Sequence, residues 1–148
     1  MRLGSMEYMR TVMARSNGDE KYRKLAKGQN ETYTLVLEAE PSRGVSDPVI
    51  VGFECKDGEF VEVWQGQRPT MFTLSAPYGV WVDILRGKLG PTKAITMRRL
   101  KTQGPFLQLL KGAERVIYWV DILRTVPTEF EGDFSQYDIT GQDDRSDA

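Results

Sequence analysis

Residues 72–110 combine extensive apolar helix surface with almost no chemically reactive side chains. The segment has the patterns of a strand, a helix, a short helix, a second strand and a longer helix. The helix expected over residues 78–85 is apolar around most of its circumference and should be buried on more than one face. A small sheet alone does not need so much apolar helix surface. The segment therefore predicts an interior that holds an oily molecule.

Composition argues against the common forms of catalysis. Histidine is absent from all 148 residues, which excludes a Ser-His-Asp triad, a Cys-His pair and an imidazole metal ligand. The single cysteine, Cys55, lies in an alternating apolar run, and we interpret it as a packed strand residue rather than a nucleophile. One cysteine also excludes an intrachain disulfide. We expect a non-enzymatic protein without a metal or another cofactor.

The length of the chain predicts one domain that buries about two thirds of the surface exposed by its unfolded form. Charged residues interrupt every long apolar stretch, and the N-terminus lacks the apolar region of a signal peptide. We therefore expect a cytoplasmic protein. Residues 1–18 are expected to form a partly helical N-terminal segment, and residues 1–5 resemble a cloning remnant before a natural start at Met6. The domain itself is expected over residues 19–126.

Charge is unevenly distributed along the chain. Residues 127–148 carry seven acidic side chains and one basic side chain, a net charge of −6, which leaves residues 1–126 at +5. We interpret residues 127–148 as a partly disordered, solubilising acidic tail. Two alternatives remain open. Either the tail covers basic surface on the body, or the body makes transient contact with the anionic surface of a membrane.

The first half of the chain predicts two helices and three strands. Two helices are expected before Gly28, separated at Gly18, with Asp19 as the N-cap of the second. The hydrophobic period then changes to two, which indicates strands over residues 32–39, 49–55 and 60–65. Asp57 and Gly58 are typical of a tight hairpin turn. These strands should form a three-stranded antiparallel meander.

The second half predicts two more strands and the remaining helices. A strand over residues 70–75 leads to Pro77 in the first turn of a helix, and Pro91 begins a second, short helix. A fifth strand is expected over residues 98–103. A long amphipathic helix follows Gly104-Pro105, with Gly112 as a candidate break. The predicted fold class is α+β, a five-stranded mixed sheet with helices on one face.

One set of residues matches a recurring family pattern. A helix ends in leucine-x-glycine-lysine-leucine, a proline follows, an alanine begins the next helix, and a leucine-lysine strand closes on glycine. At this spacing the chain resembles the sterol carrier protein type-two (SCP-2-like) family, particularly its stand-alone microbial members, over about residues 20–110. Two departures are Arg98, where the family has glycine, and Pro105, where it has an acid. The matching residues are Leu85, Gly87, Lys88, Leu89, Pro91, Ala94, Leu100, Lys101 and Gly104.

The resemblance implies a fold and a ligand class. Members of this family enclose an apolar tunnel between one face of the sheet and its helices. They bind sterols, fatty acids, fatty acyl groups or phospholipids without transforming them. The resemblance therefore implies a lipid-binding protein whose partner is a long apolar small molecule.

The candidate residues for the tunnel wall lie on strand four, on the helices and in the crossing segments. Plain core packing is the competing interpretation for each of them. Met97 is favoured slightly because a thioether adapts to irregular ligands, whereas Trp64 and Trp119 are left open as core or rim residues. The candidates are Phe72, Leu74, Trp81, Ile84, Leu85, Met97, Leu100, Phe106, Leu109 and Leu110.

Two rival functions come from other classes. In the first, Arg98 and Trp81 fill the tunnel, and the domain serves protein interaction or oligomerisation, including a homodimer. In the second, carboxylates such as Asp83, or Glu54 with Glu62, act in an enzyme. Nucleic-acid binding is disfavoured, since the basic run at residues 97–101 is typical of a solvated sheet face.

Overall fold

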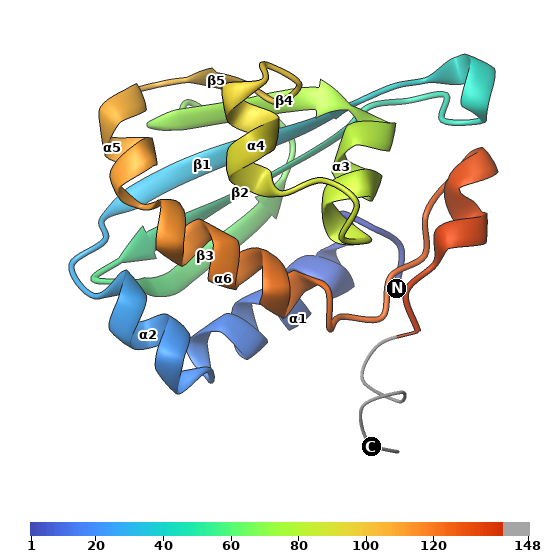
Figure 1. The fold of residues 1–148 in the computed structure, drawn as a ribbon. Coiled ribbons are helices and arrows are strands. Elements are labelled where there is room, and N and C mark those ends of the chain that lie inside the picture. Colours follow the sequence, from blue (N-terminus) through green and yellow to red (C-terminus); the bar gives the residue numbers. More distant parts are fainter. Residues whose placement is uncertain (141–148) are drawn as a thin grey trace.

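Five strands form one mixed sheet in a computed structural model of the chain, which describes residues 1–140 (Figure 1). The strand order is β3-β2-β1-β4-β5, with β1 and β4 parallel and every other neighbouring pair antiparallel. The predicted meander, crossover and α+β class are confirmed. The strands are β1 (Glu31–Glu38), β2 (Val49–Lys56), β3 (Glu59–Gln65), β4 (Phe72–Pro77) and β5 (Lys101–Gln103).

Helices cover one face of this sheet (Figure 1). The predicted breaks at Gly18 and Gly112 are both present, and the Asp19 carboxylate accepts a hydrogen bond from the Tyr22 N–H at 2.8 Å. Pro77 ends β4 and precedes the next helix, instead of lying in its first turn, because β4 pairs with β1 as far as Glu38. The helices are α1 (Met6–Asn17), α2 (Glu20–Ala26), α3 (Tyr78–Leu85), α4 (Pro91–Thr96), α5 (Phe106–Lys111) and α6 (Ala113–Leu123), with 3₁₀ turns η1 (Pro41–Arg43) and η2 (Gly132–Tyr137).

The segment between α4 and β5 differs from the prediction. Residues 98–100 make a turn rather than the beginning of the strand, and the N–H groups of Arg99 and Leu100 donate to the Ala94 carbonyl at 2.9 and 3.0 Å. This turn satisfies a carbonyl at the end of α4 and requires a left-handed residue. Arg98 occupies that position with φ 60°. Because glycine adopts the left-handed conformation without strain, it suits position 98 better than arginine.

Replacing Arg98 with glycine should stabilise the fold. The left-handed conformation costs a non-glycine residue about 1 kcal/mol, so the free energy of unfolding should rise by about 1 kcal/mol, and the melting temperature by about 3 °C. Thermal denaturation measures both. In the matched control, Lys93→Gly within α4, stability should fall by about 1 kcal/mol. A melting temperature that falls in Arg98→Gly would contradict the proposed strain.

The two terminal segments, on either side of the domain expected over residues 19–126, pack against the rest of the chain. Leu3 is buried, and its N–H donates to the Glu129 carbonyl at 3.1 Å. Phe130 and Phe134 are also buried, with the Phe134 ring centroid 5.5 Å from that of Tyr78. The net charge of residues 127–148 predicted an acidic tail and did not indicate that these two aromatic residues are buried. Of the expected disordered tail, residues 141–148 lie outside the described part.

The opposite face of the sheet is covered by side chains rather than helices. The Trp64 indole lies over Gly52 of the neighbouring strand, where an added Cβ would meet the ring at 2.4 Å. The Arg68 guanidinium lies 4.2 Å from the Trp64 ring centroid. Trp64 is therefore packed on the face away from the helices.

Candidate functional site

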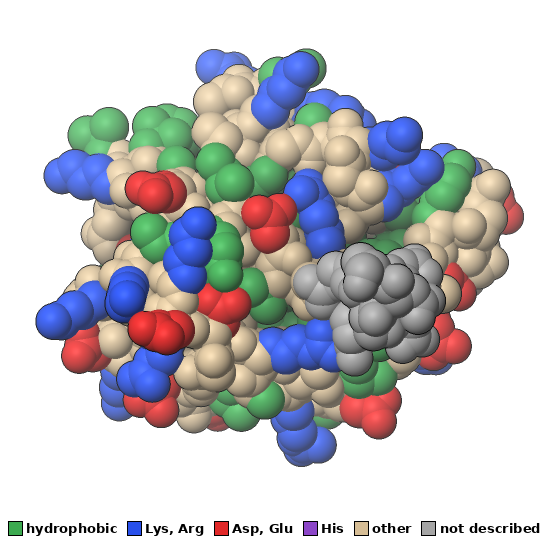
Figure 2. All heavy atoms as spheres, turned by 60° about the horizontal axis from the view of Figure 1, so that its bottom comes forward, with side chains coloured by type: hydrophobic (Ala, Val, Ile, Leu, Met, Phe, Trp, Pro, Cys, Tyr) green, Lys and Arg blue, Asp and Glu red, His purple; other side chains and the backbone are tan. Residues whose placement is uncertain are grey.

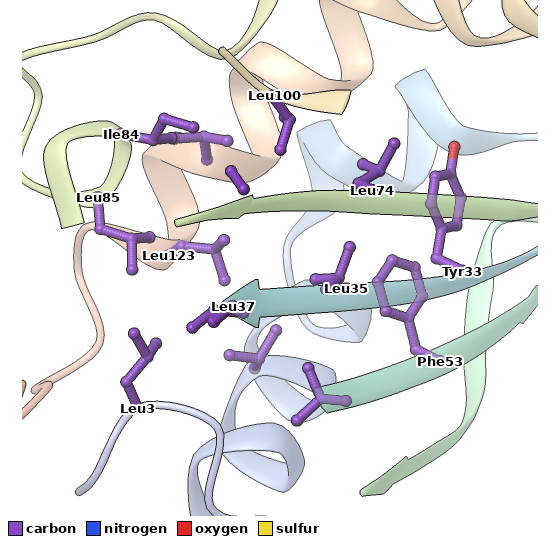
Figure 3. Packing of buried hydrophobic residues seen from close by; sticks show 14 of the residues in the cluster. Leu3, Tyr33, Leu35, Leu37, Phe53, Leu74, Ile84, Leu85, Leu100 and Leu123 are labelled. Carbon is purple, nitrogen blue, oxygen red and sulfur yellow. The ribbon is translucent and has the colours of Figure 1, made fainter. Parts of the chain in front are cut away.

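An apolar cavity of about 100 Å³ lies between the helix-covered face of the sheet and the helices. Figure 3 shows how its wall is built: Leu35 and Leu74 project from the adjacent strands β1 and β4 on the side where Leu100 lies. In a strand, alternate side chains share a face, so Tyr33, Leu35 and Leu37 of β1 all contribute to this wall. The cavity is enclosed almost entirely by hydrocarbon.

Six of the ten predicted wall residues line this cavity, and four lie elsewhere. Phe72 is buried beside it and stacks on the Tyr33 ring at 4.8 Å between centroids. Met97, Phe106 and Leu110 have 54%, 44% and 36% of their surface exposed. On α5, Leu109 alone is buried, so Phe106 and Leu110 of the predicted apolar face are partly open to solvent. The six at the cavity are Leu74, Trp81, Ile84, Leu85, Leu100 and Leu109.

Sequence reasoning missed most of the wall. The missed residues come from the N-terminal segment, α2, the meander, α4 and α6. The alternation in β1 could have indicated which of its residues share a face, but not which face the helices cover. The missed apolar residues are Leu3, Tyr8, Met9, Val12, Tyr22, Tyr33, Leu35, Leu37, Val51, Phe53, Pro91, Ile95, Val116, Trp119, Val120 and Leu123.

The two residues suspected of filling the interior leave it open. Arg98 is exposed. Trp81 forms part of the wall, and its indole N–H donates to the Val36 carbonyl at 3.0 Å. Trp119, left open by the sequence, is also a wall residue: its ring lies 5.2 Å from the Phe53 ring, and its N–H donates to the Ser16 hydroxyl at 3.0 Å.

The volume of the cavity limits what it holds in this closed form. A cavity of roughly 150 Å³ accepts benzene, so about 100 Å³ is too small for a long acyl chain. A larger ligand requires a wall to move. The six-residue helix α5 is the best candidate, because Leu109 is its single buried side chain and no side chain caps its N-terminus.

A buried polar cluster joins α5 and α6 to the beginning of β1. The Glu31 carboxylate accepts hydrogen bonds from Gln29 at 2.9 Å, from the Tyr33 hydroxyl at 2.9 Å and from Gln108 of α5 at 2.7 Å. Arg115 of α6 adds an ion pair at 3.1 Å. Gln29 and Tyr33 also line the cavity. The cluster therefore holds α5 closed over one end of the cavity.

The cluster keeps Glu31 ionised and Tyr33 protonated. Burial by itself would raise the pKa of Glu31, but hydrogen bonds from Gln108 and Gln29 and the charge of Arg115 hold that pKa below its ordinary value. Burial, followed by the negative charge of Glu31, raises the pKa of the Tyr33 hydroxyl. Tyr33 therefore remains a hydrogen-bond donor to the carboxylate.

The groups considered for catalysis lie away from this cavity. Burial raises the pKa of the Cys55 thiol to about 12, so it stays neutral. Glu54 and Glu62 oppose each other across β2 and β3, and Glu62 is paired with an arginine at 2.8 Å. Asp83 lies between two arginines at 3.8 and 3.9 Å. Within residues 1–140, no group of three His, Cys, Asp or Glu side chains is placed to bind a metal ion.

Comparison with known proteins agrees with this architecture. The model of the SCP-2 sterol transfer family matches residues 10–113. The chain belongs to this family. In this SCP-2 family member, the recurring glycine at Gly104 has φ 123°, and an added Cβ would lie 2.5 Å from the Met71 carbonyl. Leu89, Ala94 and Leu100 of the same pattern are buried, so these motif positions serve turns and packing.

Solved structures share the fold at low sequence identity. A crystal structure of sterol carrier protein 2 superimposes with a TM-score of 0.76 and 21% identity, covering 84% of this chain and 99% of the other. A Thermus thermophilus protein described as possibly a sterol carrier protein gives 0.73 and 21%, with 84% and 89% covered. Palmitated SCP2L2 from Aedes aegypti gives 0.58 and 15%, with 80% and 96% covered. A search of curated proteins gave no match.

Proposed function

We propose that this protein binds and carries a lipid-like ligand in the apolar cavity without transforming it chemically. The observation that carries the proposal is a cavity enclosed by hydrocarbon between the sheet and the helices of an SCP-2 family chain. Its ligand would be a fatty acid, a fatty acyl group, a phospholipid or a sterol-like lipid. The palmitated form of the Aedes aegypti structure supports an acyl ligand for this fold.

The driving force is the transfer of apolar surface from water. Each buried methylene contributes ~0.8 kcal/mol, so a long acyl chain gains on the order of ten kcal/mol before its ordering costs are subtracted. Part of this energy separates the walls of the closed cavity. The hydrogen bond from Gln108 to Glu31 is the polar contact that α5 gives up when it moves outward.

A second candidate function is protein interaction or oligomerisation by a domain with an occluded interior. The small closed volume favours it, because about 100 Å³ holds no long-chain lipid unless a wall moves. The exposed apolar side chains of α5 would then contact a partner. Ligand binding in solution distinguishes the two functions.

Binding is tested by filling the cavity. Wild-type protein purified gently should release lipid in native mass spectrometry and should bind a fluorescent fatty acid with micromolar or better affinity. Leu74→Phe places extra volume in the cavity and should weaken this binding at least tenfold. Its stability should change by less than the roughly 1–3 kcal/mol that overpacking costs a filled core.

The matched control makes the same kind of change outside the cavity. Val61 is 45% exposed on β3, and Val61→Phe should leave binding unchanged. If wild-type protein carries no lipid, and a fatty-acid titration changes neither its tryptophan emission nor its melting temperature, the carrier function is wrong and the interaction domain is favoured.

A further inference from the structure

A long basic segment runs along one edge of the molecule. Residues 84–113 contain seven lysines and arginines and no acidic residue. They include β5, the edge strand of the sheet, and α4 and α5, which precede and follow it in the chain (Figure 1). Lys93, Arg98, Lys101 and Lys111 are exposed, and none forms an ion pair with another residue of the described 1–140. Their charges remain available to a partner.

The same edge carries most of the exposed apolar side chains. Five of the seven large apolar residues that are exposed within residues 1–140 lie here or directly beside α5. Leu107 is the most open, with 74% of its surface exposed. Met71 contacts α5 through Gln108, whose amide donates to the Met71 sulfur at 3.5 Å. We call these five residues and the four cations the α4–α5 face; its apolar members are Met71, Met97, Phe106, Leu107 and Leu110.

Acidic side chains of the described C-terminal segment form ion pairs with groups outside the α4–α5 face. Glu129 pairs with the N-terminal amine at 3.4 Å, Glu131 pairs with Arg2, and Asp133 pairs with Arg43 at 3.7 Å. The described C-terminal segment lies beside the N-terminus, away from α5 (Figure 1). Figure 2 shows basic and hydrophobic side chains along the upper edge of the molecule. Basic side chains therefore lie in one region of the surface and acidic side chains in another. This separation of charge orients the protein as it approaches a negatively charged partner.

Basic and apolar side chains together match the surface of an anionic bilayer. Lysine and arginine pair with lipid phosphates, while aromatic and aliphatic side chains enter the boundary between headgroups and acyl chains. No described helix is long and apolar enough to cross a membrane, so such contact is interfacial. Arg98 places an exposed cation in this face, although its φ of 60° would be unstrained in glycine.

We propose that the α4–α5 face docks on anionic lipid bilayers, with Phe106 and Leu107 entering the headgroup region. The helix that docks is also the movable wall, since Leu109 of α5 lines the cavity and Gln108 binds Glu31. Docking would therefore bring the opening of the cavity to the membrane. Cargo exchange there rests on the proposed function, whereas docking itself is measured without cargo.

Vesicle co-sedimentation tests the docking. The protein should bind vesicles of phosphatidylcholine mixed with phosphatidylglycerol, should not bind phosphatidylcholine alone, and should dissociate as salt is raised. Leu107→Asp should weaken binding at least about tenfold, because it replaces an apolar side chain with a negative charge. Lys101→Glu combined with Lys111→Glu should also weaken binding at least about tenfold, because each cation near the surface contributes about 1 kcal/mol. Arg98→Gly should weaken binding while raising stability, which separates its charge from its conformation.

Matched controls place the same changes on other surfaces. Val61→Asp on β3, and Lys24→Glu combined with Lys27→Glu on α2, should retain vesicle binding, since these exposed residues lie outside the α4–α5 face. Equal binding to neutral vesicles, or equal loss in these controls, would overturn the proposal. A wild-type dimer that Leu107→Asp dissociates, without vesicle binding, would also overturn it and assign the face to self-association.

Fatty-acid binding in solution separates this proposal from the proposed function. Leu107→Asp should bind the fluorescent fatty acid like the wild type while losing vesicle binding, because Leu107 does not line the cavity. Vesicle binding by a wild-type protein that takes up no fatty acid would support the docking face and contradict carriage.

Discussion

Replacing Glu31 with glutamine should lower the free energy of unfolding by about 3 kcal/mol, because it leaves a buried cation without its partner. The Glu31 and Arg115 side chains are 5% and 12% exposed and lie 3.1 Å apart. Glutamine has nearly the same shape but no charge to balance the guanidinium. Urea denaturation at neutral pH measures the change.

An exposed ion pair provides the control. Glu62 and Arg68 lie 2.8 Å apart with about half of each side chain exposed, so Glu62→Gln should cost less than about 1 kcal/mol. Arg115→Met should be as damaging as Glu31→Gln, and the double variant should be less destabilised than the sum of the two. If Glu31→Gln is as mild as Glu62→Gln, the cluster does not stabilise the closed fold.

The same residue should produce a dependence of stability on pH. The folded-state pKa of Glu31 is lowered from its ordinary value of 4.5, so the unfolded chain binds the proton more readily. The stability due to Glu31 is therefore present above the ordinary pKa and lost as pH falls through the lower folded-state pKa. Denaturation in a series of acidic buffers should show a steeper loss for the wild type than for Glu31→Gln.

Removing residues 127–148 should be the most destabilising change of all. Phe130 and Phe134 are 5% and 3% exposed in the core, and the loss of each buried phenylalanine costs about 3–5 kcal/mol. That sum is comparable to the whole stability of a typical domain. A chain ending at Val126 should therefore be largely unfolded by circular dichroism and thermal denaturation.

A point substitution keeps the test informative if the shortened chain does not fold. Phe134→Ala alone should lower the free energy of unfolding by about 3 kcal/mol, since its ring packs on Tyr78 and lies 4.4 Å below the Arg43 guanidinium. Gln136→Ala in the same turn removes an exposed side chain and should change stability by less than about 0.5 kcal/mol. Equal effects of the two would show that η2 contributes little to the fold.

Sequence patterns were reliable where the signal was local. The turn at Asp57 and Gly58, with φ values of 49° and 80°, depends on residues that tolerate positive φ. The breaks at Gly18 and Gly112 and the cap at Asp19 are similarly decided within a few residues. The alternation in the meander predicted its strands and pairing for the same reason.

Burial was harder to predict because it depends on elements distant in the chain. Phe106 and Leu110 have the spacing of a buried helix face, yet 44% and 36% of their surface is exposed. Phe130 and Phe134 lie among acidic residues, yet they pack against segments far earlier in the sequence. Composition and periodicity describe a segment by itself and do not reveal which partner covers it.

The order of the elements, the mixed sheet, the absence of histidine chemistry and the resemblance to the SCP-2 family all follow from the amino-acid sequence. That Trp119 and Leu3 belong to the wall of the cavity, and that Arg98 lies outside it, follows from how the elements pack in three dimensions. It also joined Glu31 to two helices about eighty residues later in the chain. A cavity is the space left between packed elements, so no single segment encodes it.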